Sequence, residues 1–297
     1  MNITNKQNKA YTFALLAVLL WSTVATAFKL TLALISPVEL LLYSSIFSLI
    51  FFTIVIFYQG MQKEIIKSFY KNKKMILFSS LLNPFVYYLL LFEAYNVLPA
   101  QEAQAINYTW GLMLAYLSVP LLGHKLATRD IVAGLLCYFG VYIIATHGEI
   151  FAFEFSSIYG IGIALATTLI WALYWIANTK IKIDPIIILF LNFLFGLIFL
   201  LIYIVIAGIE ISLPNKEALM GTLYIGLFEM GISFVLWLKA MKLTSNTAKI
   251  SNLIYLSPPL SLFFIQTFLG EKILMSTLVA LGFIFVGIGV QKIARKE

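Results

Sequence analysis

The carboxylate of Glu229 lies near the middle of a long apolar segment, residues 218–241. An ionisable group in the hydrocarbon of a bilayer costs at least about 2.5 to 3.5 kcal/mol, so such groups are functional candidates. A carboxylate at this depth could bind the ammonium group of a substrate or carry a coupling proton. A protonated glutamate that only bonds neighbouring helices is the structural alternative, and the sequence leaves both open.

Aromatic, amide and hydroxyl side chains also fall deep inside the apolar segments, where their polar groups need a partner or water. Together with Glu229 they could line an amphipathic pocket for a zwitterion or an aromatic solute. Hydrogen bonds between helices, which contribute on average about 0.6 kcal/mol each, are the alternative for any one of them. The pocket candidates are Trp21, Asn83, Tyr88, Asn107, Tyr108, Trp110, Trp171, Trp175, Asn178, Asn192, Asn252, Tyr255 and Ser257.

Charged residues near the segment ends form a second group of candidates. Glu93 and Glu102 lie near one side of the expected membrane, whereas Lys239 and Lys249 lie near the other. These charges could act as gates that engage a partner when a cavity closes, or they could simply extend to the nearest interface. Lys29, towards the outer end of its segment, could pair with Glu93, Glu102 or a substrate carboxylate, or it could extend outward to the interface.

Residues for metal binding or covalent catalysis are scarce. Cys137 is the single cysteine, and His124 and His147 are the two histidines, which excludes a disulfide within the chain and leaves little material for a metal site. The chain also has no Walker A motif. We therefore expect no enzyme, no metal and no cofactor, although an intramembrane enzyme or assembly factor that uses Glu229 as a general acid stays an alternative.

The elements that would position these residues are membrane-spanning helices. Of the 297 residues, 62% are apolar and only 11% are charged, against about 25% charged in soluble proteins. Segments this long and this apolar predict helices rather than barrel strands, and hence an all-α membrane protein. The ten predicted segments are 11–32, 37–59, 75–96, 101–121, 131–147, 158–178, 185–207, 218–241, 247–269 and 276–291.

The basic residues predict the orientation of these helices. Most Lys and Arg residues fall in alternate connections, including five lysines between residues 63 and 74, whereas Glu149, Glu154 and Glu210 fall in the others. Cytoplasmic loops carry an excess of Lys and Arg, so both termini are expected in the cytoplasm and the protein in a bacterial inner membrane. The same rule accounts for the net charge of +7 without a nucleic-acid partner.

The two halves of the chain resemble each other. Residues 122–126 match residues 269–273 at a spacing of 147, and the same spacing relates Gly140 to Gly287. A nearby spacing places Asn83, which Pro84 follows, opposite Glu229. We therefore predict two five-helix repeats, residues 1–147 and 158–297, inserted in opposite senses, because five is an odd number. A substrate site near the bilayer midplane is typical of such inverted repeats.

Motifs spread over the whole chain resemble the drug/metabolite transporter superfamily, EamA type, and the run from Asn107 to Trp110 is most similar to its aromatic amino-acid exporter branch. This resemblance implies ten helices around a central cavity. Three positions depart from the family pattern: Gly111 replaces a proline and so predicts a weaker kink, His124 replaces a glutamate, and Tyr43 and Ser44 replace a basic residue. The motifs include Trp21-Ser22-Thr23, Phe92-Glu93-Ala94, Trp171-Ala172, Trp237-Leu238-Lys239-Ala240, Leu256-Ser257-Pro258 and Leu269-Gly270-Glu271.

We therefore predict a secondary transporter that moves small organic metabolites by alternating access, with export of amino acids or related amphipathic compounds as the most specific interpretation. A passive channel is the second alternative. The expected partners are a small-molecule substrate and the lipid bilayer. No GxxxG sequence marks a dimer contact, so the oligomeric state stays open, with a monomer as one option.

Overall fold

The computed structural model describes residues 3–123, 128–151, 156–179, 182–244, 250 and 253–292, and its regular structure within these ranges is entirely helical. The first half contains α1 (Ile3–Leu32), α2 (Pro37–Tyr58), α3 (Gln62–Ser80), η1 (Leu81–Val86), α4 (Tyr87–Val97), α5 (Ala100–Asn107), α6 (Trp110–Leu122) and α7 (Thr128–Ala145). The second half contains α8 (Ile158–Thr179), α9 (Pro185–Ala207), α10 (Lys216–Tyr224), η2 (Ile225–Ile232), α11 (Ser233–Leu243), η3 (Leu253–Leu256), α13 (Ser257–Phe264), η4 (Ile265–Leu269) and α14 (Met275–Lys292).

Seven helices in the described ranges are long and apolar enough to cross a membrane, and two further apolar helices, Ile131–Ile144 and Met275–Val290, are shorter. These nine match nine of the ten predicted segments. The remaining segment, 247–269, lies partly outside the described residues, which hold η3, α13 and η4 of it.

The third helix begins earlier than the hydropathy predicts. We expected a basic loop before residue 75, but α3 already starts at Gln62, with a bend at Asn72, where φ is −129°. Lysines at four-residue spacing occupy one face of its first turns, while Ile65 and Phe69 pack towards α9, where the Phe69 and Phe195 rings stack 4.8 Å apart. Averaging over the charged and apolar faces hides this amphipathic helix from a hydropathy profile.

The fourth helix breaks where the sequence predicted only a weak kink. Helix α5 ends at Asn107 and α6 begins at Trp110, although Gly111 replaces the proline of the family pattern. The Thr109 hydroxyl donates to the carbonyl of Ile106 at 2.8 Å. Such a bond competes with the helical ladder at this position. Because Thr167 and Thr168 make the same kind of bond inside the continuous helix α8, this bond alone does not account for the break.

The helices that bear Asn83 and Glu229 both depart from α winding near the middle of their apolar spans. In the first half, η1 separates α3 from α4 and contains a kink at Asn83, whose φ of −144° and ψ of 125° are not helical, and the next residue, Pro84, removes a backbone donor. In the second half, η2 separates α10 from α11 and carries Glu229. Wide helical turns of this kind direct side chains away from the regular pattern and frequently mark functional sites.

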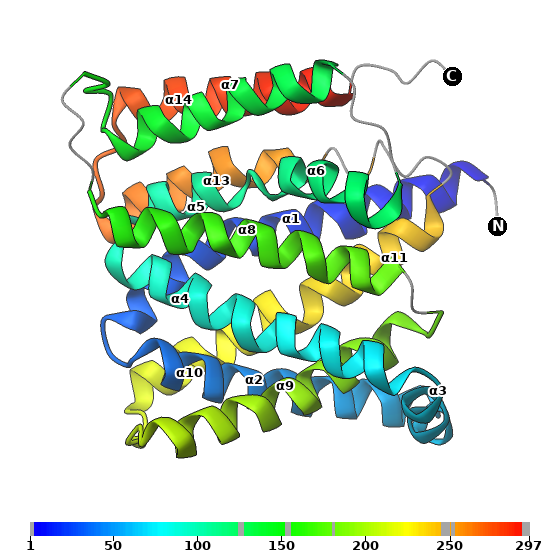
Figure 1. The fold of residues 1–297 in the computed structure, drawn as a ribbon. Coiled ribbons are helices and arrows are strands. Elements are labelled where there is room, and N and C mark those ends of the chain that lie inside the picture. The colour runs from blue at the N-terminus through cyan, green and yellow to red at the C-terminus, as the bar shows by residue number, and fades with distance from the viewer. Residues whose placement is uncertain are drawn as a thin grey trace.

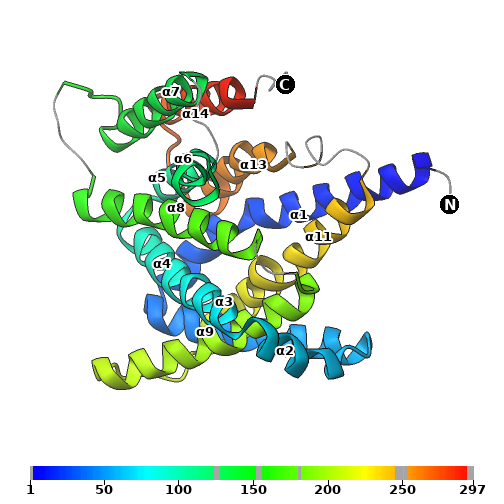
Figure 2. The same ribbon diagram turned by 45° about the vertical axis from the view of Figure 1, so that its right-hand side comes forward.

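The helices form layers that run roughly parallel (Figure 1). Helix α1 packs beside α11 and α13, α4 lies beside α8, and α2, α3 and α9 form the layer below them in Figure 1. Helices α7 and α14 pair at the opposite edge in both views (Figure 2). The start of α1 and the end of α14 lie on the same side of the molecule.

Candidate functional site

Glu229 has one partnered and one unpartnered carboxylate oxygen. The Tyr88 hydroxyl of α4 donates to Glu229 Oε1 at 3.1 Å. The other oxygen, Oε2, is buried and has no hydrogen-bond partner within the described residues. On the neighbouring turns, Ser48 of α2 donates to the carbonyl of Met230 at 3.2 Å, and Ser233 donates to the carbonyl of Phe228. These bonds give partners to two backbone carbonyls of η2 and so stabilise its winding, while Oε2 of Glu229 remains without a hydrogen-bond partner.

Aromatic rings extend from Tyr88 between α4 and α8. The Tyr87 ring lies 5.0 Å from Tyr88 and stacks on Trp171 of α8 at 4.5 Å, with 28° between their planes. Trp171 in turn stacks on Tyr174 at 5.3 Å and meets Trp175 edge to face at 6.0 Å. Centroid separations in this range are the favourable ones for aromatic pairs.

Amide side chains surround the hydroxyl groups of these rings. Asn107 Nδ2 donates to Thr167 Oγ1 at 3.0 Å and to the Tyr87 hydroxyl at 3.4 Å. Asn192 Nδ2 donates to the Tyr174 hydroxyl at 3.2 Å, and Asn83 and Asn178 face that same hydroxyl. We call the group formed by Tyr87, Tyr88, Trp171, Tyr174, Asn178 and Glu229 the Glu229 site.

The structure brings most of the predicted pocket residues to this site or to its edge. Trp21 joins it through Phe234, whose ring lies 5.8 Å from Trp21 and 6.4 Å from Trp171. Tyr108 faces Tyr87 and Tyr95 across the interior. Ser257 is more distant and accepts a hydrogen bond from Ser22 of α1 at 3.3 Å.

Other predicted residues are not placed at the Glu229 site. Trp110 starts α6, and no contact given for the described residues joins it to Glu229. Asn252 and Lys249 lie outside the described residues, as does the side chain of Tyr255. Two residues of the site, Tyr87 and Tyr174, were not predicted from the sequence. Their positions could have indicated them, because Tyr87 is next to Tyr88 and Tyr174 is three residues after Trp171.

The charges that we expected near the outer end of the membrane form bonds that differ from the predicted ones. Lys29 does not pair with Glu93 or Glu102; its Nζ donates to the carbonyls of Tyr95 and Leu98, at 2.8 and 2.9 Å. The last carbonyls of α4 have no partner inside their own helix, and a cation suits the negative end of the helix dipole. Lys29 therefore caps the C-terminal end of α4.

The start of α5 is bonded to the residues that follow α7, to the turn before α14 and to α14 itself. Glu102 is buried and lies 2.7 Å from Nε2 of His147, and Ser156 donates to its second oxygen at 2.5 Å. Two residues earlier, the Ala100 amide donates to Glu271 Oε1 at 3.0 Å, and between them the Gln101 amide oxygen accepts from Thr277 at 2.8 Å. Helix α5 is thus bonded to His147 and Ser156, to the turn before α14 and to the first turn of α14.

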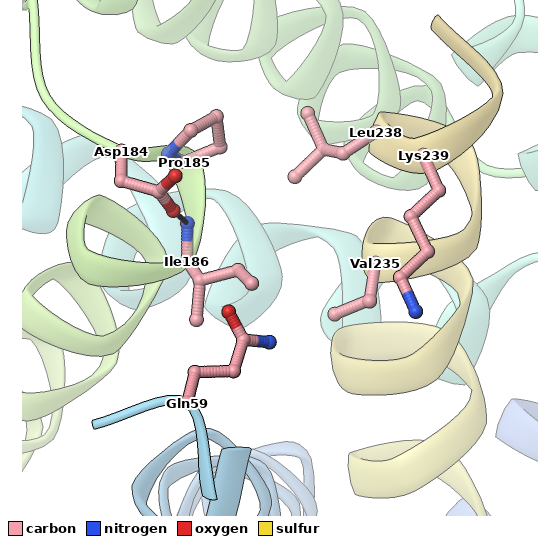
Figure 3. Close-up of a pocket in the computed structure, with 7 residues that line it drawn as sticks. All are labelled: Gln59, Asp184, Pro185, Ile186, Val235, Leu238 and Lys239. Carbon is pink, nitrogen blue, oxygen red and sulfur yellow. Dashed lines mark hydrogen bonds between the residues drawn. The ribbon is translucent and has the colours of Figure 1, made fainter. Parts of the chain in front are cut away.

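Glu93 and Lys239 have weaker contacts. Glu93 Oε2 accepts from Asn96 Nδ2 at 3.4 Å. Lys239 Nζ lies 5.9 Å from the centre of the Phe13 ring, and its side chain lines a pocket of about 150 Å³ at the ends of α2, α9 and α11. Figure 3 shows Lys239 across this pocket from Gln59 and from Asp184, whose carboxylate caps α9 by accepting from the Ile186 amide at 2.9 Å.

A second, more open pocket of about 610 Å³ lies between α13 and α14 and is lined mainly by apolar side chains such as Leu262, Phe263 and Phe285. Neither pocket is lined by Glu229. Over the described parts of the chain, no three His, Cys, Asp or Glu side chains gather in a way that could hold a metal ion.

Comparisons with known proteins agree with this architecture. The EamA-like transporter family matches residues 8–146 and again residues 158–290. One solved crystal structure of a protein is 20% identical, covers 96% of this chain and 96% of its own length, and superposes with a TM-score of 0.67, which shows a shared fold. No curated protein sequence matches. With nearly its whole length covered by the two matched regions, the chain belongs to the EamA-like transporter family.

Proposed function

We propose that this membrane transporter is a secondary carrier that moves small organic metabolites across the bacterial inner membrane by alternating access. Amino acids or related amphipathic compounds are the proposed cargo, and their export is the proposed direction. The observation that carries the proposal is the half-partnered carboxylate of Glu229, which lies in the middle of a membrane helix beside stacked aromatic rings.

The proposed inverted repeat is supported by a reciprocal contact between α7 and α14. A Cβ atom on Gly140 would lie 2.7 Å from the carbonyl oxygen of Ala280, and one on Gly287 would lie 2.7 Å from that of Ala133. These two contacts exchange when each residue is replaced by its mate 147 positions away. The thiol of Cys137 likewise donates to the carbonyl of Ile284, at the same spacing of 147. A local twofold axis would produce this pattern.

The pairing of η1 with η2 supports the same arrangement. Both segments interrupt corresponding helices; Asn83 of η1 lies beside the Tyr174 hydroxyl, and Glu229 of η2 accepts from the Tyr88 hydroxyl. In an alternating-access cycle, the two halves would rock about this level and expose the Glu229 site to one side at a time. The bonds at the start of α5 would then hold the outer end closed.

Solute counterflow in proteoliposomes tests the proposal. Vesicles that contain the full chain and internal unlabelled phenylalanine should take up external labelled phenylalanine faster than vesicles that contain the chain but no internal phenylalanine. Only a carrier accelerates uptake by exchange in this way. A channel gives no such acceleration, and equal uptake with and without internal solute would contradict the proposal. If the uptake of labelled phenylalanine is the same with and without the protein, and with and without internal phenylalanine, the proposal that the protein transports amino acids is wrong.

Glu229→Gln tests the role of the carboxylate in the same vesicles. We expect the exchange rate to fall roughly tenfold or more, because the amide keeps the bond to Tyr88 but loses the negative charge. Glu217→Gln is the matched control, since Glu217 is exposed at the start of α10 in the same membrane span. A Glu229→Gln variant that exchanges at the rate of the unmodified protein, with unchanged pH dependence, would make Glu229 structural.

A further inference from the structure

Buried polar atoms without a partner show what a bound molecule must supply. Among the described residues, four such atoms belong to side chains at or beside the Glu229 site: Asn83 Oδ1, Asn178 Oδ1, Glu229 Oε2 and Trp175 Nε1. Three of the four are acceptors. The Tyr174 hydroxyl accepts from Asn192 and can give its one proton to either Asn83 or Asn178, which leaves at least two acceptors unmet. Because an unsatisfied buried polar group is costly, this region is complementary to a molecule that brings mainly hydrogen-bond donors.

The acceptor character of two of these atoms, Asn178 Oδ1 and Glu229 Oε2, is fixed by the bonds that their side chains make. Asn178 Nδ2 donates to the backbone carbonyl of Tyr174 at 3.0 Å, and a carbonyl can only accept. The amide of Asn178 therefore cannot be turned around, and its free atom is the oxygen. Glu229 Oε1 already accepts from Tyr88, which leaves Oε2 to receive a donor from elsewhere.

The rings around the site favour a cation as that donor. Tyr87, Trp171 and Tyr174 form a stack of three aromatic rings, and Trp175 presents its edge to Trp171. The quadrupole of an aromatic ring attracts an ammonium group that lies over a free face of the ring, and the attraction grows when water is excluded. Because Tyr87 and Tyr174 both stack on Trp171, a cation would meet the tyrosine rings at the ends of this stack. The same rings offer an apolar surface for the body of the molecule.

Within the described residues, no contact places a basic side chain at the Glu229 site that could bind a carboxylate of the ligand. A substrate carboxylate was one of the possible partners of Lys29, but the ammonium group of Lys29 donates to two carbonyls at the end of α4. The position where the family pattern has a basic residue holds Tyr43 and Ser44, and the Tyr43 hydroxyl donates to the carbonyl of Ser212 at 2.6 Å.

We propose that the Glu229 site binds the ammonium group of an amphipathic organic amine, with Glu229, Asn178 and Asn83 as its acceptors, and that the ligand needs no carboxylate. This ligand class rests on the proposed transport function, because it identifies the cargo of that same site. The proposed cargo is thereby narrowed from amino acids and related compounds in general to those that the site recognises through the amine alone.

Three compounds with the same phenyl group separate the possibilities: phenethylamine carries only the amine, phenylalanine carries both groups, and 3-phenylpropionate carries only the carboxylate. Binding to the purified full chain is measured by the ligand-induced shift in melting temperature and by tryptophan fluorescence, since Trp171 and Trp175 lie at the site. We expect both amines to bind and 3-phenylpropionate not to bind. Equal affinity for 3-phenylpropionate and phenethylamine, or no binding by either amine, would overturn the proposal.

Substitutions then locate the binding. Glu229→Gln should raise the Kd for phenethylamine roughly tenfold or more, the loss expected when a charge-assisted hydrogen bond is removed from a buried site. Glu217→Gln should leave the Kd unchanged. If the Glu229→Gln protein is unstable, Glu229→Asp is measured instead, because it keeps the charge and shortens the side chain. This variant should still bind the amine, with a higher Kd than the unmodified protein. An unchanged Kd in the Glu229→Gln variant would contradict the assignment.

Counterflow of labelled phenethylamine distinguishes failure of this inference from failure of the transport function. Amine binding without exchange would leave the ligand class intact and contradict transport. Exchange of phenylpropionate without exchange of either amine would leave transport intact and contradict the ligand class.

Discussion

At the scale of single residues, the partners of a membrane-embedded charge decide its role. Glu229 and Lys29 both lie within membrane helices, yet Lys29 donates to two carbonyls whereas Glu229 leaves one oxygen unpartnered. Hydropathy treats the two residues alike, because it counts the charge and ignores the partner. We therefore assign Lys29 to stability and Glu229 to ligand binding.

Replacing Lys29 tests this division. Lys29→Met should lower the free energy of unfolding by about 2 kcal/mol, because hydrogen bonds of a charged donor contribute in that range and the carbonyls of Tyr95 and Leu98 lose their partner. Thermal unfolding in detergent measures the effect. Lys63→Met is the control, since Lys63 is exposed on α3 and should change stability little. A Lys29→Met protein as stable as this control would show that the cap of α4 contributes nothing.

At the scale of the elements, close helix contacts depend on where glycine occurs. Gly140 on α7 and Gly287 on α14 each face a backbone carbonyl of the partner helix, whereas a Cβ on Gly289 of α14 would meet nothing within 4 Å. The sequence repeat identified Gly140 and Gly287 as mates, but only the packing shows that they meet across one interface. The same packing explains why α7 and α14 pair at the edge of the molecule.

Alanine at these glycines measures that contact. Gly140→Ala and Gly287→Ala should each destabilise the protein by about 1 to 3 kcal/mol relative to Gly289→Ala, because a backbone carbonyl cannot move aside and the helices must separate. All three substitutions gain the same helix propensity, of about 1 kcal/mol, so the comparison isolates the clash. Melting temperatures of the three variants supply the measurement. Equal stability of all three would contradict the close approach of α7 and α14.

At the scale of the whole molecule, the sequence predicted the helices and their likeness between halves but few of the contacts between them. Apolar length identified nine segments found as helices, and Glu229 was identifiable from its depth. The Glu102 to His147 pair, the cap that Lys29 forms and the roles of Tyr87 and Tyr174 were not predictable. These contacts join residues far apart in the chain, and their geometry depends on helix rotation and on the π segments, which hydropathy does not encode.

If the two halves are inverted, equivalent connections of the two halves must face opposite sides of the membrane. Lys63 follows α2 and Glu210 follows α9, at the spacing of 147 that relates the halves, and both side chains are exposed. Lys63→Cys should react with a membrane-impermeant thiol reagent only from the cytoplasmic side, where basic residues concentrate. Glu210→Cys should react only from the outside. Labelling in intact cells and in inverted vesicles measures both, and the unmodified protein is the blank, since its cysteine, Cys137, is buried. Reaction of both variants from the same side would contradict the inverted repeat and, with it, the placement of the Glu229 site at the meeting point of two oppositely inserted halves.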